Sequence, residues 1–169
     1  SPGLSWPSIV LNRSICGLSP SASLMLGGAW RCSLGGMKAA GAIPIGRTNL
    51  PSGAIRWHCE SELWGATINP WDRTRTPGAS SAGEAAAIAT GMSPLGLGSD
   101  GLGSLRYPAQ CCGIAALKPT LGRVPHASTI EPEYATIGIQ LTSVNGPLAR
   151  RVADLRAAFG VLAGPTWRD

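Results

Sequence analysis

The feature that most constrains this chain is a pair of glycine-rich loops, at residues 78–83 and 100–104, that flank one helix-like run. Ser80 lies in the first loop and Ser104 in the second. A serine beside glycines presents its hydroxyl and the neighbouring backbone N–H groups to a substrate without interference from side chains, which suits a nucleophile and an oxyanion hole. Two such serines on adjoining loops predict a hydroxyl relay.

Four longer segments contain or adjoin these loops, and together they resemble the amidase signature family, the serine hydrolases that cleave amides with a Ser-Ser-Lys triad. The segments read AAGAIPIGRTNLP, LWGATINPWDRTRTPGASSAGEAAA, MSPLGLGSDGLGSLRYPAQCCGIAALKPTLGRVP and GPLARRVADL. The resemblance extends from about residue 35 to about residue 164. It implies an α/β fold, with a mixed β-sheet core flanked by helices, that forms part of an amidase signature fold.

The resemblance also implies roles for the loop residues. Ser104 corresponds to the acyl nucleophile. Ser80 corresponds to the bridging serine, which the family places after a cis peptide bond and which passes a proton between the nucleophile and a lysine. For direct transfer, the two hydroxyl oxygens should lie within about 2.6 to 3.5 Å of each other. Ser81 is interpreted as structural. The family's oxyanion hole corresponds to the backbone N–H groups of Gly101, Leu102, Gly103 and Ser104.

Three departures from the family pattern bear on activity. Ala79 and Ala82 replace glycines of the first loop, which the fold tolerates if neither position needs a positive φ. Leu102 replaces a glycine at an oxyanion position. The family's lysine segment, G-[VI]-P-x-x-[VL]-K, has no counterpart in residues 1–76, and Lys38 and Lys118 align with other parts of the family. We therefore expect this chain to be inactive alone.

Length points to a fragment, because amidase signature enzymes are typically much longer than these 169 residues. We expect residues 1–34, rich in Ser, Trp, Cys and Arg, to be an unmatched and poorly ordered N-terminal segment, and residues 35–169 to form a partial amidase signature domain. A domain separated from a larger core leaves apolar faces uncovered. We expect such faces at residues 113–117 and 148–162.

The pattern from residue 39 onward alternates between helix and strand. A strand is expected at residues 43–46 after a short helix, and further strands near residues 113–117 and 137–141. Pro147 is expected to open a helix. Its apolar face would consist of Leu148, Val152, Leu155, Phe159 and Leu162.

Two short motifs have competing interpretations. Ser81-x-x-Glu84 predicts a capping box for a helix over residues 82–90. Residues 96–101 match G-x-G-x-x-G, but Pro108 interrupts the helix that a dinucleotide site requires, so no nucleotide cofactor is expected. Asp100 and Arg106, which flank Ser104, are expected to hold the loop by charge-assisted hydrogen bonds.

Composition narrows the function classes. The net charge of +5 comes from scattered arginines without an aromatic and basic stripe, so nucleic acid is not an expected partner. No apolar run reaches the ~18 residues of a membrane helix. The five cysteines are odd in number and lack metal-ligand spacing, which favours reduced thiols in the cytoplasm and no metal site. Trp57 and Trp64 are candidates for an acyl pocket, but Trp64 and Trp71 lie in the LWGATINPWD segment, which has the character of a packing segment, so a structural role is favoured for the aromatic cluster.

The resemblance implies an amidase-type serine hydrolase without a cofactor. A small-molecule carboxylic amide would acylate Ser104 and yield a carboxylate and ammonia or an amine. Self-association is left open. Two alternatives stand beside this prediction: a non-catalytic amidase-fold protein for binding or assembly, and the transamidating subunit of a tRNA-dependent amidotransferase.

Overall fold

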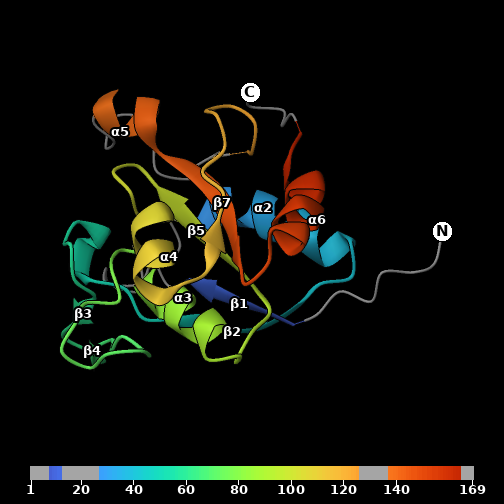
Figure 1. The fold of residues 1–169 in the computed structure, drawn as a ribbon. Coiled ribbons are helices and arrows are strands. Elements are labelled where there is room, and N and C mark those ends of the chain that lie inside the picture. Colours follow the sequence, from blue (N-terminus) through green and yellow to red (C-terminus); the bar gives the residue numbers. More distant parts are fainter. Residues whose placement is uncertain (1–7, 13–26, 126–136, 165–169) are drawn as a thin grey trace.

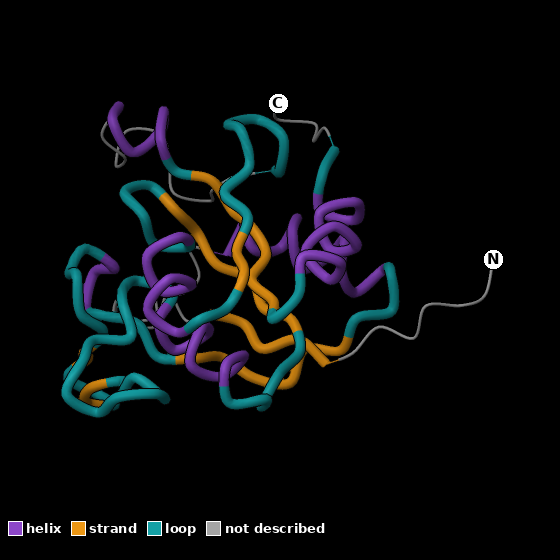
Figure 2. The backbone as a smooth tube through the Cα atoms, in the orientation of Figure 1, coloured by secondary structure: helices purple, strands orange, loops and turns teal. Residues whose placement is uncertain are grey.

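The fold is built on a five-stranded mixed sheet with the strand order β2-β1-β5-β7-β6. In the computed structural model, residues 8–12, 27–125 and 137–164 are described. The central strand β5 (Leu95–Asp100) pairs in parallel with β1 (Ser8–Asn12) and antiparallel with β7 (Val144–Ala149). The edge strands are β2 (Ile43–Thr48), parallel to β1, and β6 (Ala115–Ala116), antiparallel to β7. The expected mixed α/β architecture is confirmed (Figures 1 and 2).

Helices cover both faces of this sheet. On one side lie α3 (Ala82–Ala89) and α4 (Arg106–Cys112), and on the other lie α2 (Gly27–Ala39) and α6 (Val152–Leu162), as Figure 1 shows. Because successive strand residues point to opposite faces, Leu95 and Leu97 join the core with α2 and α6. Leu148 of β7 joins the second core, with α3 and α4. Gly96 and Gly98 alternate with the leucines along β5 and therefore face the opposite side, toward α3.

Two element assignments made from the sequence are wrong. Pro147 does not open a helix: it lies in β7, paired with Leu97, and α6 begins only at Val152. Pro147 is compatible with strand pairing because its carbonyl oxygen accepts the N–H of Leu117 at 3.1 Å, on the side of the two-residue strand β6, so its missing N–H does not face β5. Residues 137–141 form a helix, α5 (Ile137–Thr142), in place of the expected strand. This segment pairs with no strand, so its apolar residues do not enter the sheet.

The other strands expected from the sequence are present, but they begin and end at different residues. The strand expected at residues 43–46 is β2, and the strand expected near residues 113–117 is the short β6. Cys111 and Cys112 lie at the end of helix α4 and not in a strand. Pro108 is the third residue of α4, in the first turn, where no intrahelical N–H donor is required. It therefore does not interrupt that helix.

The N-terminal segment contains two regular elements, although it falls outside the family resemblance. Strand β1 lies inside the sheet between β2 and β5, and the first part of α2 also precedes residue 35. Strand β1 thus contributes to the sheet, and α2 to the helices that cover it. The other residues of the segment, including Cys16, lie outside the described residues.

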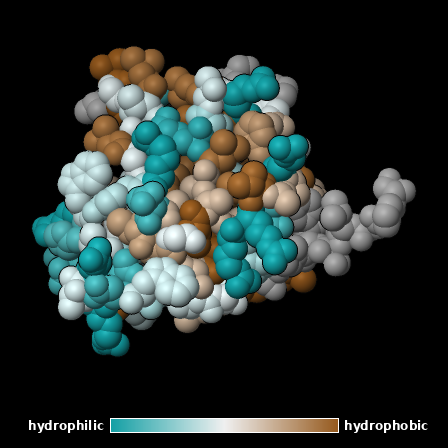
Figure 3. Space-filling model, in the orientation of Figure 1, coloured by the Kyte–Doolittle hydropathy of each residue, from teal (hydrophilic) through white to brown (hydrophobic). Residues whose placement is uncertain are grey.

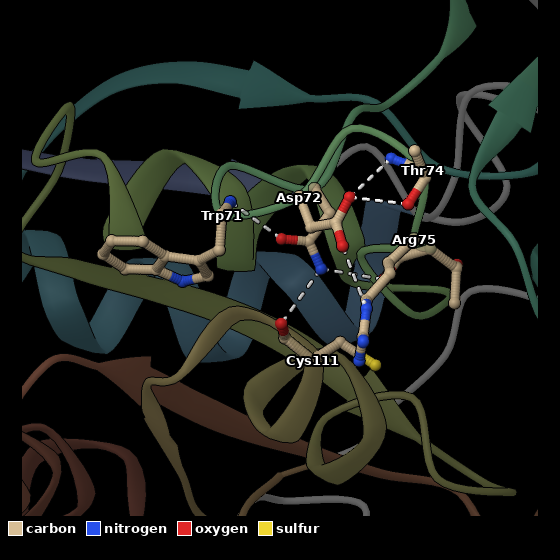
Figure 4. A network of polar contacts seen from close by, with 7 residues as sticks. Trp71, Asp72, Thr74, Arg75 and Cys111 are labelled. Carbon is tan, nitrogen blue, oxygen red and sulfur yellow. Dashed lines mark hydrogen bonds and ion pairs between the residues drawn. The ribbon is translucent and has the colours of Figure 1, made fainter.

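The long connection from β2 to α3 is anchored to the end of α4. It contains the 3-10 turn η1 (Ser52–Ala54) and a hairpin of β3 (Glu60–Ser61) and β4 (Gly65–Ala66). The Asn69 side-chain amide donates to the carbonyl oxygens of Thr76 and Cys111, both at 3.0 Å, and its oxygen accepts the N–H of Trp71 at 2.9 Å (Figure 4).

The Trp71 indole N–H donates to the carbonyl oxygen of Cys112 at 2.6 Å. The last carbonyls of a helix have no intrahelical partner, and Asn69 and Trp71 satisfy two of them at the end of α4. Trp71 therefore has a structural role, which it fulfils by this hydrogen bond from an exposed position.

Most of the leucines expected to be exposed at residues 148–162 are buried, and an exposed apolar surface is found on α5. Leu148, Leu155 and Leu162 are buried against the sheet. Instead, α5 presents Ile137, Ile139 and Leu141 to solvent, and they form the brown patch at the top of Figure 3. A cavity of about 700 Å³ does open between α4 and α6 and is lined in part by residues 113–117. Within the described residues, no helix has the length and apolar character needed to cross a membrane.

Candidate active site

The loop that carries Ser104 is organised around one buried carboxylate. Strand β5 ends at Asp100, whose side chain has 0 % exposure. Asp100 Oδ1 accepts the N–H of Gly103 at 2.7 Å, and Oδ2 accepts the N–H groups of Leu105 at 3.1 Å and Arg106 at 3.3 Å. The Arg106 guanidinium adds two bonds, from Nε to Oδ2 and from Nη2 to Oδ1, both at 3.0 Å. The contacts expected between Asp100 and Arg106 are therefore present.

These five hydrogen bonds set the charge state of Asp100. Burial by itself raises the pKa of a carboxyl, but the Arg106 side chain and the three backbone N–H groups together hold the pKa of Asp100 below its usual range. The same contact raises the pKa of Arg106. The loop is thus folded around a charged carboxylate, and its backbone N–H groups are oriented before any substrate arrives.

Leu102 fits the backbone of this loop. Among the described non-glycine residues only Ala54 has a positive φ, so Leu102 takes an ordinary conformation, whereas Gly103 has φ +118°. The Leu102 side chain is 77 % exposed and points away from the core. The left-handed position of the loop is therefore at Gly103, where glycine is retained.

The loop that carries Ser80 lies against the first turn of α4. The peptide bond between Ala79 and Ser80 is cis, as expected, and neither Ala79 nor Ala82 has a positive φ. Gly78 has φ +89°, and a Cβ there would lie 2.6 Å from the Cα of Pro108. Glycine is required at that position and not at the two positions where alanine occurs.

One backbone hydrogen bond joins the two serine loops. The N–H of Ser81 donates to the carbonyl oxygen of Ser104 at 3.3 Å. Ser80 is 2 % exposed and Ser104 is half-buried, so the second hydroxyl is the more accessible to a ligand. The tertiary structure therefore brings together the two loops that carry Ser80 and Ser104.

The capping box predicted for α3 is wrong. Ser81 is the N-cap residue, but its side chain makes no capping hydrogen bond, and Ser81 Oγ is buried without a hydrogen-bond partner. Glu84 does not reach back to the N-cap. Its Oε2 accepts the hydroxyl of Thr48 at 2.8 Å, and Oε1 has no hydrogen-bond partner. Both side chains point toward the sheet because α3 packs directly on β5.

Two glycines of β5 make room for these side chains. A Cβ on Gly96 would overlap Glu84 Oε1, and a Cβ on Gly98 would lie 2.5 Å from Ser81 Oγ. Gly96 and Gly98 of the G-x-G-x-x-G motif thus have a packing explanation. Burial raises the pKa of Glu84 well above its usual value, against the opposing effect of the Thr48 hydrogen bond, so this carboxyl favours its neutral form.

Neither lysine lies on the serine loops. Lys38 is exposed in the last turn of α2, and Lys118 is half-buried after β6. The described residues contain no group of His, Cys, Asp and Glu side chains that could hold a metal ion. The described cysteines whose state is known are free thiols: Cys59, Cys111 and Cys112.

Thr48 and Asn49 were missed by the sequence reasoning. Thr48 holds Glu84, and a Cβ on Gly83 would overlap the Asn49 carbonyl oxygen, so β2 ends directly against α3. Asn49 also bonds to Thr67 and Ser61 of the hairpin region, at 3.0 and 2.9 Å. The available signal was their position in the Arg-Thr-Asn run at the end of a predicted strand.

The comparisons with known proteins agree with this geometry. The family model described as Amidase matches residues 34–169. The indoleacetamide hydrolase of Bradyrhizobium diazoefficiens is 44 % identical over 133 residues, which cover 79 % of this chain and 25 % of the relative. A glutamyl-tRNA(Gln) amidotransferase subunit from Methanococcoides burtonii is also 44 % identical over 133 residues, covering 79 % of this chain and 27 % of the relative.

Solved structures of amide-cleaving enzymes also resemble this chain over part of their length. A structure of 6-aminohexanoate cyclic dimer hydrolase with its substrate has a TM-score of 0.77 and 31 % identity, covering 95 % of this chain and 35 % of that one. The chain matches about a quarter of the length of these curated relatives. On the family match and these identities, the chain belongs to the Amidase family.

Proposed function

We propose that this chain carries the nucleophile and the oxyanion hole of an amide hydrolase. The observation that carries the proposal is the pair of loops joined by the Ser81 N–H and the Ser104 carbonyl, with the Ser104 loop anchored by Asp100. Relatives that share this part of the chain include an indoleacetamide hydrolase and a peptide amidase of Stenotrophomonas maltophilia. A carboxylic amide is accordingly the proposed substrate class.

In the proposed reaction, Ser104 Oγ attacks the amide carbonyl carbon, its proton passes to Ser80, and the proton of Ser80 passes on to a general base. In the resembled family that base is the lysine, which the grafted segment of a relative would supply. The carbonyl oxygen becomes an oxyanion that accepts hydrogen bonds from the backbone N–H groups of Gly101, Leu102, Gly103 and Ser104. Collapse breaks the C–N bond, and the leaving amine takes a proton. Water then hydrolyses the ester on Ser104 and releases the carboxylate.

The chain by itself is proposed to be a weak catalyst. General-base assistance typically contributes about 10² to 10⁴-fold, and Ser80 has no lysine near it among the described residues whose side chains are placed. We therefore expect amide hydrolysis at no more than the background rate. Grafting the lysine segment and the remaining length of a relative should restore turnover, which Ser104→Ala should then abolish.

Labelling with a fluorophosphonate tests the nucleophile without requiring turnover. The reagent is an activated electrophile, so Ser104 should form a covalent adduct that mass spectrometry locates. Ser104→Ala should remove the adduct, and Ser80→Ala should slow its formation. A folded chain that is labelled at another serine, or at none, would contradict the proposal.

Transamidation is the second candidate. It is supported by the 44 % identity to the Methanococcoides burtonii amidotransferase and by a TM-score of 0.80, at 29 % identity, to the structure of a glutamyl-tRNA(Gln) amidotransferase subunit from Thermotoga maritima. The same loops would then release ammonia from an amide donor. Glutamine-dependent amidation by the grafted protein, in place of simple hydrolysis, would identify this activity.

A scaffold role is the third candidate, and it is supported by the lack of a lysine beside Ser80 among the described side chains. In that case Ser104 would remain unlabelled in a folded chain. We also propose a reducing, cytoplasmic location, which the free thiols of Cys59, Cys111 and Cys112 support.

A further inference from the structure

The Trp57 side chain is exposed, yet it contacts a defined neighbour. It is 61 % exposed and lies in the connection between β2 and β3. Its ring meets the ring of Tyr107 edge-to-face, with centroids 5.6 Å apart and planes at 71°. This is a favourable geometry for two aromatic rings, because the positive edge of one faces the negative face of the other.

Tyr107 is in turn held by helix α4. Its backbone N–H donates to the carbonyl oxygen of Gly103 at 2.7 Å. Trp57 therefore packs on a ring that the nucleophile loop and α4 position together.

The Trp57 ring also lies directly against the residue before Ser104. A Cβ on Gly103 would be 3.8 Å from Trp57 Cζ3 and 3.9 Å from Tyr107 Cβ, which is van der Waals distance. Leu102, the next residue back, is 77 % exposed. Apolar side chains from the β2–β3 connection, from α4 and from the loop itself therefore lie next to the residue that precedes Ser104.

Trp71, which lies in the same connection and is also exposed, has a structural role. Trp71 is 69 % exposed, but its indole N–H donates to the Cys112 carbonyl and completes the end of α4. Trp57 completes no helix end in this way and belongs to neither buried core. Its position beside the nucleophile loop therefore calls for a different explanation.

We propose that Trp57, with Tyr107 behind it, forms one wall of the substrate site and selects amides that carry an aromatic ring next to the scissile group. This inference rests on the proposed function and specifies its substrate class. A ring laid against Trp57 gains aromatic contact beyond the burial of its surface, whereas a saturated ring of the same size gains only the burial. The expected preference for the aromatic compound is about 3- to 10-fold in affinity.

Binding of two matched amides to the full chain tests the inference without turnover. Phenylacetamide and cyclohexylacetamide differ in aromaticity and have similar size, and their dissociation constants can be measured by ligand-observed NMR. Phenylacetamide should bind about 3- to 10-fold more tightly. Trp57→Ala should abolish the difference, and Trp57→Phe should retain most of it.

Trp64→Ala is the matched control, because it removes another exposed tryptophan, in the hairpin region, and should leave both constants unchanged. Circular dichroism of each variant confirms that it is folded. Equal affinities for the two amides, no detectable binding of phenylacetamide, or a preference that survives Trp57→Ala would each overturn the inference.

Fluorophosphonate labelling of the same samples separates this inference from the proposed function. Labelled Ser104 without an aromatic preference overturns the Trp57 wall and leaves the nucleophile in place. An aromatic preference that depends on Trp57, in a chain whose Ser104 is not labelled, supports the wall and contradicts the hydrolase.

Discussion

Two fully buried carboxyl groups, Asp100 and Glu84, lie beside the two serine loops. They differ in their hydrogen-bond donors and in the direction in which their pKa is shifted. Asp100 accepts five hydrogen bonds, two of them from a guanidinium. Glu84 accepts the hydroxyl of Thr48 on one oxygen and leaves the other without a hydrogen-bond partner. The pKa of Asp100 is lowered and that of Glu84 is raised. Burial therefore does not decide the charge of a carboxyl in this fold; the number and charge of the donors decide it.

The donors also come from different distances along the chain. Those of Asp100 all lie within the next six residues, so the nucleophile loop organises itself locally. Thr48 lies 36 residues before Glu84, and the space that receives Glu84 is made by Gly96 on another strand. The Ser80 side of the site consequently depends on tertiary packing, and it retains two unsatisfied buried atoms, Ser81 Oγ and Glu84 Oε1.

The largest effect is expected from Asp100→Ala. The substitution leaves Arg106 and three backbone N–H groups without their acceptor. The Arg106 side chain is 58 % exposed and can be hydrated, so the cost comes mainly from the N–H groups, at about 1–3 kcal/mol of unfolding free energy for each one that stays buried. Urea denaturation at pH 7 measures the loss. Ser104 labelling should fall as well, because the loop loses its anchor.

Asp72→Ala is the matched control for this experiment. Asp72 makes a similar 3.0 Å ion pair with Arg75, but on the surface, where screening by solvent weakens it. Its removal should cost clearly less than that of Asp100. Equal losses from the two substitutions would mean that the Asp100 contacts do not hold the loop.

An intermediate effect is expected from Gly96→Ala. The added methyl group meets the buried Glu84 carboxyl, and overpacking of this kind costs about 1–3 kcal/mol. Gly46→Ala in β2 is the control, because its Cβ would meet no atom within 4 Å. Combining Gly96→Ala with Glu84→Ala should cost less than the sum of the two single changes, as measured by urea denaturation. Strict additivity would show that the two residues do not compete for this space.

The smallest effect is expected from Glu84→Gln at acidic pH, where both side chains are neutral and nearly the same shape. The folded-state pKa of Glu84 is raised, so its contribution to stability is complete below the unfolded-state pKa and is lost as pH rises through the folded-state pKa. The wild type should thus lose stability relative to Glu84→Gln as pH rises, by at most about 1.4 kcal/mol per pH unit. Urea midpoints at a series of pH values measure this slope.

The pH dependence of Asp100 has the opposite sign. Its folded-state pKa is lowered, so its stabilisation is present above the unfolded-state pKa and is lost as pH falls through the folded-state pKa. A Glu84→Gln profile that runs parallel to that of the wild type would show that Glu84 is charged in the folded protein.

Much of this protein could be predicted from local sequence. The glycine-flanked serines, the contacts of Asp100 with Arg106, the strand at the start of the family segment and the mixed α/β class depend on neighbouring residues or on a pattern that covers most of the chain. The contacts of the nucleophile loop are encoded within a few residues, because Asp100 finds all its hydrogen-bond donors within the next six residues.

Only the tertiary structure decided the rest. Ser81 and Glu84 have the spacing of a capping box, but the close packing of α3 on Gly96 and Gly98 draws both side chains to the sheet. The local sequence at Gly146 and Pro147 favours the start of a helix, but pairing with β5 makes both residues part of a strand. In each case a weak local preference of about 1 kcal/mol or less yields to contacts made across the chain, whose combined burial and hydrogen bonding outweigh it.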